Sequence, residues 1–382
     1  MSSAMPRLLF AVTTDLNYDQ RMQRICGSLA GQGYTVLLVG RALPQSLPLT
    51  PQPYQQHRLR CWFTKGKLFY LEFTLRLLAY LLTQRAAVWC AIDLDTALPV
   101  WLRARLGGQP FVYDAHELFT EMPEVVRRPA VQWVWRQVEK FIVPRASLAY
   151  TVGPALAAVF RQRYGRTFEV IRNISRLTVE AAPPVPNNSL ILYQGVLNEG
   201  RGLEALLEAM PNVRGQLVLC GEGDLSVELR ARAAQLGLLA SGKVSFRGYV
   251  LPAELRQLTR QARVGVLLLE NRGLSYYYSL ANKFFDYLHA GVPQVVIDFP
   301  EYRALNAQCP VADLVPDLQP AALAAALTRL LPGGDEAHYQ ELADNCRQVR
   351  TTLNWQQEEM HLLALYDALL PGQVPLTSTR NS

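Results

Sequence analysis

The stretch from residue 264 to residue 299 constrains the fold most, because it alternates short apolar runs with a helical pattern. Residues 264–269 form an apolar run of the length of one buried strand, and a polar loop follows. Apolar residues then recur at spacings of three and four up to Gly291 and Pro293, which end a helix. Residues 295–297 start the next strand. This order predicts a parallel α/β sheet, in which ligands bind at the loops beyond the carboxyl ends of the strands.

The start of the helix in this stretch favours an anion. Ser279 is expected to cap the first free N–H groups, and a helix N-terminus carries about half a positive charge. Asn282 and Lys283 add donors in the first turn, and Asp286 follows one turn later. A diphosphate at the helix start and a ribose diol at the carboxylate would use all four side chains. A capped amphipathic helix with solvated charges explains the same pattern equally well.

The alternation of strands and helices occurs in both halves of the chain, whose 382 residues suit two domains of ordinary size. We expect one domain at residues 1–175 and another at residues 190–351. A Pro- and Asn-rich linker is expected at 176–189, and a last amphipathic helix at 352–371 packs across the domain junction. Residues 372–382 are polar and are expected to be disordered.

The cysteines and the apolar runs predict a cytoplasmic protein. The six cysteines are scattered without a CxxC or Cys/His cluster, which is typical of reduced thiols and indicates neither a disulfide framework nor a zinc site. The first residues lack the pattern of a secretory signal, and no apolar run has the length of a membrane span.

Charge is distributed unevenly along the chain. Residues 1–180 contain 22 Lys or Arg against 12 Asp or Glu, whereas the remaining residues contain 16 against 20. A basic N-terminal half favours an anionic partner, and the absence of a nucleic-acid-binding motif disfavours nucleic acid. Residues 58–70, basic and aromatic, are expected to dock on an anionic membrane surface. For the leucine-rich continuation to residue 85, packing on the protein's own sheet is favoured.

Two loops carry the candidates of the N-terminal half. Residues 14–21 follow the first apolar run without a glycine-rich dinucleotide fingerprint, which disfavours a nicotinamide cofactor. There Asp19 and Arg21 either line a cleft or serve as a helix N-terminal carboxylate and a surface base. Asp114 and His116 follow the apolar run at 111–113, where His116 is expected to orient a substrate. Between these loops, the Pro- and Gln-rich residues 42–58 predict a mobile loop.

Three further loops carry candidates in the C-terminal half. Arg201 precedes a helix and suits bidentate contact with phosphate, although a solvated surface base fits equally well. Gly221 and Gly223 in the segment GEGD permit close backbone approach, which an ordinary tight turn also explains. Tyr249 ends another strand, in a loop whose backbone groups could meet a nucleobase.

At these loops the sequence resembles the GT-B-fold glycosyltransferases of the large retaining family 4 over nearly its whole length. The resemblance rests on five segments: DQRMQRICGSLAGQGYTVLLVGR, VYDAHELFTE, YQGVLNEGRGLEALLEA, LVLCGEGD and SLANKFFDYLHAGVPQVV. It implies two Rossmann-like domains facing across a cleft, with the last helix returning to the first domain. It also implies a nucleotide-diphosphate sugar in the C-terminal domain, an acceptor in the N-terminal domain, and neither a metal nor another cofactor.

The resemblance assigns roles to the candidate residues. Arg201 and Lys283 would neutralise the donor diphosphate, and Asp286 matches the second glutamate of the family's Glu-x7-Glu motif, which binds the ribose. The expected catalytic residues are His116, Arg201, Glu270 and Lys283. The expected donor-binding residues are Gly221, Glu222, Gly223, Tyr249, Ser279, Asn282 and Asp286. The expected acceptor-side residues are Asp19, Arg21 and Asp114.

The sequence departs from the family pattern at three places. Tyr278 stands where the first motif glutamate is expected, and Glu270 is the nearest carboxylate that could replace it. The N-terminal double-glycine loop is replaced by residues 15–21, and Val196 stands where a first basic residue is usual.

We therefore expect a retaining sugar-nucleotide glycosyltransferase acting on a polysaccharide or lipid-linked acceptor, at the inner face of the cell membrane. Two alternatives remain open at this point. A catalytically silent nucleotide-sugar-binding subunit would bind the donor without turnover, and a sugar-nucleotide epimerase on the same fold would convert the donor without an acceptor.

Overall fold

The computed structural model describes residues 5–178 and 187–372. The chain forms two compact units, the first comprising Met1–Arg172 with Glu358–Ser382 and the second Asn173–Gln357. Most of the expected linker at 176–189 and nearly all of the expected tail at 372–382 lie outside the described residues.

The described part of the first unit contains a sheet of seven parallel strands in the order β3-β2-β1-β4-β5-β6-β7. The strands are β1 (Arg7–Ala11), β2 (Thr35–Ala42), β3 (Gln55–Arg60), β4 (Val88–Ile92), β5 (Phe111–Ala115), β6 (Leu148–Thr151) and β7 (Glu169–Val170). Every residue of β4 and β5 is buried, as expected for central strands covered on both faces. The prediction of a loop at 42–58 is wrong for its last residues, because strand β3 begins at Gln55. This strand lies at the edge of the sheet, where an apolar run is not needed, so these residues carry no strand signal.

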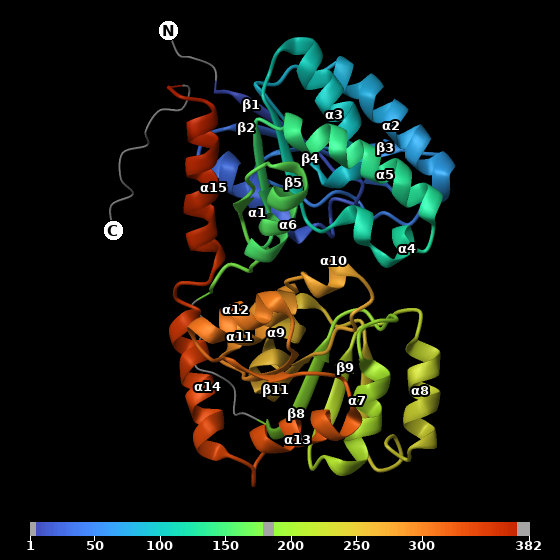
Figure 1. Ribbon diagram of the computed structural model, residues 1–382, viewed down its shortest axis with the longest axis vertical. Helices are drawn as coiled ribbons and strands as arrows, with labels where there is room; N and C mark the ends of the chain where they lie inside the picture. Colours follow the sequence, from blue (N-terminus) through green and yellow to red (C-terminus); the bar gives the residue numbers. More distant parts are fainter. Residues whose placement is uncertain (1–4, 179–186, 373–382) are drawn as a thin grey trace. The chain divides into compact units, whose positions relative to one another are not determined.

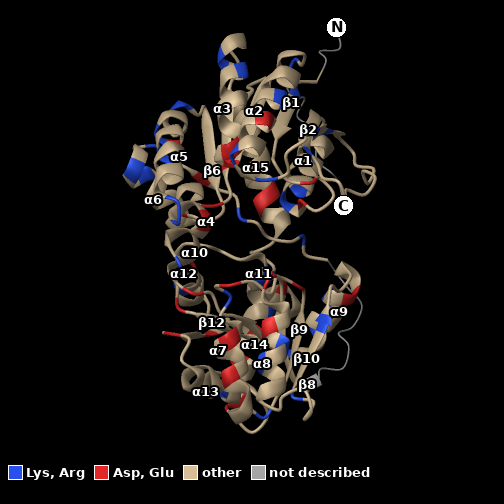
Figure 2. Cartoon of the chain, turned by 90° about the vertical axis from the view of Figure 1, so that its right-hand side faces the viewer, with Lys and Arg blue, Asp and Glu red and all other residues tan. Residues whose placement is uncertain are grey.

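Helices cover both faces of this sheet. They are α1 (Gln20–Gly31), α2 (Gly66–Leu82), α3 (Asp93–Gly107), α4 (Pro123–Val126), α5 (Pro129–Ile142), α6 (Pro154–Tyr164) and α15 (Trp355–Leu369), with short 3₁₀ turns at Phe119–Glu121 and Val143–Arg145. Figure 1 shows α2, α3 and α5 on one side of the sheet and α1 and α15 on the other. Lys and Arg are conspicuous around α5 and α6 (Figure 2).

The last helix belongs to the first unit from Glu358 onward. The Tyr366 hydroxyl lies 3.4 Å from the Cys90 sulfur in β4 and 3.2 Å from the Tyr150 hydroxyl in β6. The Tyr34 hydroxyl donates to Asp367 at 2.7 Å. These contacts, far apart in the sequence, confirm that the C-terminal helix returns to the N-terminal domain.

The described part of the second unit contains a sheet of six parallel strands in the order β10-β9-β8-β11-β12-β13. The strands are β8 (Asn187–Gln194), β9 (Gln216–Cys220), β10 (Val244–Gly248), β11 (Ala262–Leu267), β12 (Gln294–Ile297) and β13 (Ala312–Val315). The helices are α7 (Leu203–Ala209), α8 (Ser226–Gln235), α9 (Pro252–Gln261), α10 (Leu274–Tyr277), α11 (Asn282–Ala290), α12 (Pro300–Gln308), α13 (Pro320–Leu330) and α14 (Glu336–Val349), with a 3₁₀ turn at Met210–Asn212.

Close packing sets α11 directly on the middle of the second sheet. A Cβ atom at Gly265 in β11 would lie 2.5 Å from the Tyr287 ring, so only glycine allows the helix to approach this closely. The Tyr287 hydroxyl donates to the Leu192 carbonyl in β8 at 2.8 Å. The start of α11 is thereby held near the carboxyl ends of β8 and β11.

Both sheets have a topological switch point, where the strand order reverses. In the first unit it lies between β1 and β4, and in the second between β8 and β11. Open parallel sheets bind ligands beyond the carboxyl ends of the strands at such points. The two-sheet α/β architecture is the fold class that the sequence predicts, and no helix in the described ranges combines the length and apolarity needed to cross a bilayer.

Candidate active site

The start of α11 differs from the prediction. The helix begins at Asn282, and its N-cap position is Ala281, which has no capping side chain. The Ser279 hydroxyl donates instead to the Tyr276 carbonyl at 2.8 Å. The prediction that Ser279 caps α11 is therefore wrong, because the extended residue Ala281 separates the serine from the helix. The first turn of α11 is left without a side-chain acceptor at its N-cap.

Lys283 and Arg201 are two cations that share this end of the second sheet. The Lys283 Nζ atom lies 3.9 Å above the Tyr193 ring, and a Cβ atom at Gly195 would lie 3.1 Å from Nζ. The Arg201 guanidinium lies 5.3 Å from the centre of the Tyr276 ring. Within the described ranges, neither cationic side chain forms a hydrogen bond or ion pair with protein, and the Arg201 Nε atom is buried without a partner.

The electrostatics of this pair favour an anion. Burial lowers the pKa of Lys283 well below its usual range, and the positive charge of Arg201 lowers it further, while Asp286 opposes the shift. An anion bound between the two side chains would offset the cost of keeping Lys283 charged beside Arg201. The arrangement therefore favours a ligand of at least one negative charge.

Asp286 is already held by two donors. Gln194 donates to one carboxylate oxygen at 2.9 Å, and Ser175 donates to the other at 3.1 Å. These bonds fix the carboxylate at the end of β8. A carboxylate oxygen can accept more than one hydrogen bond, so a ligand hydroxyl could donate to Asp286 in addition to these two groups.

Glu270 lies beside the loop that carries Arg201. Its backbone N–H donates to the Gly200 carbonyl at 3.0 Å, and its carboxylate accepts from Arg272 Nε at 2.6 Å. Arg272 also pairs with Glu199. The sequence-based reasoning did not identify Arg272, which neutralises the one carboxylate proposed to replace the missing motif glutamate.

The glycines of the GEGD segment are required by the protein's own packing. Gly221 has φ +131°, and a Cβ atom there would lie 2.0 Å from the Gly195 carbonyl oxygen. A Cβ atom at Gly223 would lie 2.2 Å from the Asn198 side-chain oxygen. Between them Glu222 forms an ion pair with Arg230 at 2.8 Å. The loops after β8 and β9 therefore pack against each other by backbone contact. The remaining donor-side candidates, Asn282 and Tyr249, are exposed, Tyr249 by 83 %.

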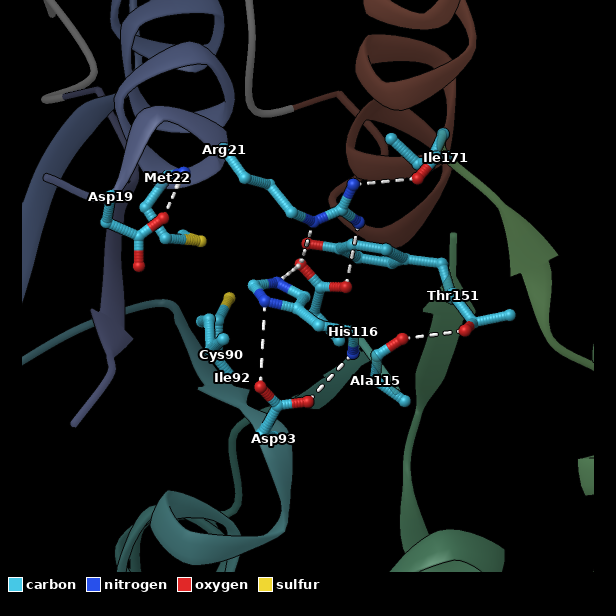
Figure 3. Close-up of polar contacts among 12 residues, drawn as sticks. Asp19, Arg21, Met22, Cys90, Ile92, Asp93, Ala115, His116, Thr151 and Ile171 are labelled. Atoms are coloured by element: carbon cyan, nitrogen blue, oxygen red, sulfur yellow. Dashed lines mark hydrogen bonds and ion pairs between the residues drawn. The ribbon is translucent and has the colours of Figure 1, made fainter. Parts of the chain in front are cut away.

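In the first unit a charged network surrounds His116 (Figure 3). His116 Nε2 lies 3.1 Å from Asp114 Oδ2, and its Nδ1 lies 3.6 Å from Asp93 Oδ2. The backbone N–H of His116 donates to Asp93 Oδ1 at 2.8 Å. Asp93, at the carboxyl end of β4, has φ +57°, a left-handed conformation that is strained for an aspartate and is common at functional sites.

This network holds His116 in its charged form. Burial alone would lower the pKa of His116, but the carboxylates of Asp114 and Asp93 raise it to about 9. Burial raises the pKa of Asp93 to about 7, although the nearby His116 opposes the shift. Burial alone would raise the pKa of Asp114, but the positive charges of Arg21 and His116 lower it below the usual range. At neutral pH the imidazolium is thus a hydrogen-bond donor, with about a fifth of its side chain exposed.

Comparisons with known proteins bear on both sites. A model described as Glycosyltransferase Family 4 matches residues 20–175, and one described as Glycosyl transferases group 1 matches residues 188–332. The two models together cover most of the chain. This protein is a family 4-like glycosyltransferase.

Solved structures confirm the GT-B fold of this glycosyltransferase. Sucrose-phosphate synthase from Thermosynechococcus elongatus is 19 % identical, with a TM-score of 0.76 over 95 % of this chain and 99 % of that one. HepE from Anabaena, in complex with UDP-glucose, is 15 % identical, with a TM-score of 0.74 over 95 % and 100 %. WaaG, described as involved in lipopolysaccharide biosynthesis, is 14 % identical, with a TM-score of 0.66 over 96 % and 100 %. No curated protein sequence matches the chain significantly.

The acceptor-side candidates of this glycosyltransferase are placed in structural roles. Arg21 is 3 % exposed and Asp114 is 0 % exposed, and they form an ion pair at 2.9 Å. Arg21 also donates to the Ile171 carbonyl at 2.8 Å, so it is neither a cleft residue nor a surface base. Asp19 is the N-cap of α1, where it accepts from the Met22 N–H at 3.0 Å.

The sequence reasoning missed the segment after β4. Asp93 and Asp95 follow this fully buried strand directly, and Asp95 accepts from the Thr13 hydroxyl at 2.6 Å, beyond β1. Burial raises the pKa of Asp95 to about 6. The signal was an Asp-x-Asp pair immediately after an apolar run of strand length. In the described part of the glycosyltransferase, no His, Cys, Asp or Glu cluster has the arrangement of a metal site.

Proposed function

We propose that this glycosyltransferase transfers a sugar from a nucleoside-diphosphate sugar to a glycan or lipid-linked acceptor, with retention and without a metal ion. The observation that carries the proposal is the pair of cations Arg201 and Lys283 at the switch point of the second sheet, neither of which forms an ion pair with a residue of the described ranges. Breaking the sugar–phosphate bond builds negative charge on the departing diphosphate. Fixed positive groups aimed at that charge stabilise the transition state without reorganising.

Three elements would act on the diphosphate together. Lys283 and Arg201 would contribute full charges, and the first turn of α11 would contribute backbone N–H groups that lack a side-chain cap. A bound diphosphate would also raise the pKa of Lys283 and keep it protonated. This set supplies the positive charge that a divalent cation supplies in other phosphate sites.

The remaining roles follow the family pattern. Asp286 would accept from a ribose hydroxyl while Gln194 and Ser175 hold its carboxylate. Glu270 would contact the donor sugar, with Arg272 fixing its orientation. The Gly221–Gly223 loop and the backbone near Tyr249 would border the nucleoside. The charged His116 would donate to a hydroxyl of the donor sugar or acceptor.

The solved relatives support a uridine nucleotide as the first donor to test. HepE is described in complexes with UDP-glucose, with UDP and glucose, and with UDP. WaaB is described as a lipopolysaccharide outer core galactosyltransferase. We propose a cell-envelope glycan as the product, made at the cytoplasmic face of the membrane, where residues 58–70 would touch anionic lipid.

Calorimetric binding of UDP, GDP and ADP, with and without Mg²⁺, tests the proposal. One nucleotide should bind equally in both conditions, and Arg201→Ala should weaken its binding by about 10- to 150-fold, the equivalent of roughly 1.5–3 kcal/mol. Arg232→Ala, on the exposed surface of α8, is the matched control and should bind as the wild type does.

The outcomes separate the rival functions. Failure of all three nucleotides to bind would refute the donor site. Binding of the nucleotide sugar without turnover, in the presence of membrane glycolipid acceptors, would indicate a silent binding subunit. Conversion of the donor to an isomeric nucleotide sugar would indicate an epimerase.

A further inference from the structure

Helix α2 of the first unit has two apolar faces. Its inner face is buried against the unit and consists of Phe69, Phe73, Leu77 and Leu81. A second row, which we call the outer leucine stripe, consists of Leu68, Leu71, Leu75 and Leu82, each more than half exposed. At about 100° per residue, the two rows point about 180° apart. Packing on the protein's own core, which the sequence favoured for this segment, therefore accounts for one face only.

The loop before α2 presents an exposed tryptophan at the start of this stripe. Trp62 is 85 % exposed. The backbone N–H groups of Trp62 and Phe63 donate to the Glu72 carboxylate at 3.0 Å, and Arg76 donates to the same carboxylate at 2.6 Å. The Arg76 guanidinium also lies 4.7 Å from the centre of the Trp62 ring. The aromatic loop is thus fastened to α2 while its large side chains face solvent.

The charge around the stripe is positive. Residues 58–85 contain six Lys or Arg and a single acidic residue, Glu72, which is already engaged by Arg76 and the loop. Arg60, Lys65 and Lys67 are exposed near Trp62, and in the described ranges none of them has an ion pair. An apolar stripe with unneutralised cations at one end is the pattern of a helix that lies in the interface of an anionic bilayer.

This charge argues against a second copy of the chain as the occupant. A twofold interface places each surface patch against the same patch of its partner, so two basic patches would be brought together. An anionic lipid surface complements both features, because acyl chains accept the leucines and headgroups attract the cations. Exposed tryptophan is also enriched at the membrane–water boundary.

We propose that α2 and the loop before it dock on an anionic lipid bilayer, with the outer leucine stripe at the acyl boundary and Lys65 and Lys67 among the headgroups. The purpose of this docking, access to a lipid-linked acceptor, rests on the proposed function. The docking surface extends the sequence-based expectation from residues 58–70 along the whole of α2. It lies within the first unit, and its test requires no nucleotide.

The test is sedimentation of the full chain with vesicles of phosphatidylcholine alone or with about a third phosphatidylglycerol. Wild type should bind the anionic vesicles and be released by salt, because each lysine near an anionic surface contributes about 1 kcal/mol, or roughly fivefold in partitioning. Lys65→Gln/Lys67→Gln should therefore partition about 25-fold less. Leu71→Gln/Leu75→Gln should abolish binding, and its exposed positions leave the core intact.

Val227→Gln/Leu239→Gln, at exposed apolar positions of the second unit, is the matched control and should bind vesicles as the wild type does. Equal binding of wild type and Leu71→Gln/Leu75→Gln would overturn the proposal, as would equal binding to neutral and anionic vesicles. Self-association of the wild type that is lost in the leucine variant, without vesicle binding, would make the stripe a protein interface and also overturn it. Nucleotide affinity measured on the same variants should not change, so failure of docking and failure of the donor site are distinguishable.

Discussion

Replacing Lys283 by Met should weaken nucleotide binding and stabilise the free protein at the same time. Methionine keeps an unbranched apolar chain over the Tyr193 ring but removes the ammonium group, which lies 3.9 Å from that ring's centre. Loss of one charge-assisted contact to a diphosphate costs about 1.5–3 kcal/mol, which is a 10- to 150-fold weaker affinity. In the free protein the same change removes a partly desolvated cation that Arg201 repels. Since the site is partly exposed, we expect a gain on the order of 1 kcal/mol in the free energy of unfolding.

The sign of the pH dependence follows from the lowered pKa of Lys283. Between that lowered pKa and the ordinary lysine value of about 10.4, the unfolded chain binds more protons at this site than the folded chain. The wild type therefore gains stability as pH rises through this window, and Lys283→Met lacks that gain. The stabilisation by the substitution should be full below the window and vanish at its upper end.

Urea unfolding across pH 7 to 10, paired with calorimetric titration of the nucleotide, measures both effects. Lys243→Met provides the contrast, because the Lys243 ammonium donates to three backbone carbonyls at 3.0–3.2 Å and its loss should destabilise the protein without changing nucleotide affinity. A Lys283→Met protein that is less stable and binds nucleotide normally would refute the reasoning, since the lysine would then be a structural group.

Three other substitutions test the networks that hold the two sites. Arg21→Met leaves Asp114 buried without its partner and should lower the free energy of unfolding by about 3–5 kcal/mol; a loss under 1 kcal/mol in urea unfolding would contradict the buried ion pair. His116→Gln should lower the free energy of unfolding by roughly 2–3 kcal/mol below pH 6.5, and this difference should disappear as pH rises through about 9. A difference in urea midpoints that does not change with pH would count against the charged histidine. Gly221→Ala forces a Cβ atom to 2.0 Å from the Gly195 carbonyl, and should both destabilise the protein by at least 1 kcal/mol and weaken nucleotide binding, with unchanged thermal unfolding as the contrary result.

Much of the second unit could be read from the sequence because its signals are local. The apolar run of β11, the helical spacing of α11 and the Gly291 stop lie within one continuous stretch. Lys283 and Arg201 could be proposed as phosphate ligands, since each stands at the start of a helix. That neither cation forms an ion pair within the described ranges could not be predicted from the sequence, because this depends on every side chain folded around them.

Residues whose roles depend on distant partners were misread. The Arg21 side chain finds Asp114 and the Ile171 carbonyl, 93 and 150 positions away, which turns an expected cleft residue into a buried structural one. The contact of Asp93 with His116 follows only from the strand order, which places the ends of β4 and β5 side by side.

The sequence by itself determined the periodicities, and hence two α/β units with parallel sheets and the family to which the chain belongs. The tertiary structure alone decided which charges are neutralised, which carboxylates titrate near neutral pH and which face of α2 is left for a partner. The physical reason is the distance along the chain over which each interaction acts. Hydrophobic period and helix ends depend on neighbours in the chain, whereas desolvation and Coulomb interaction depend on groups that only folding brings within a few ångströms.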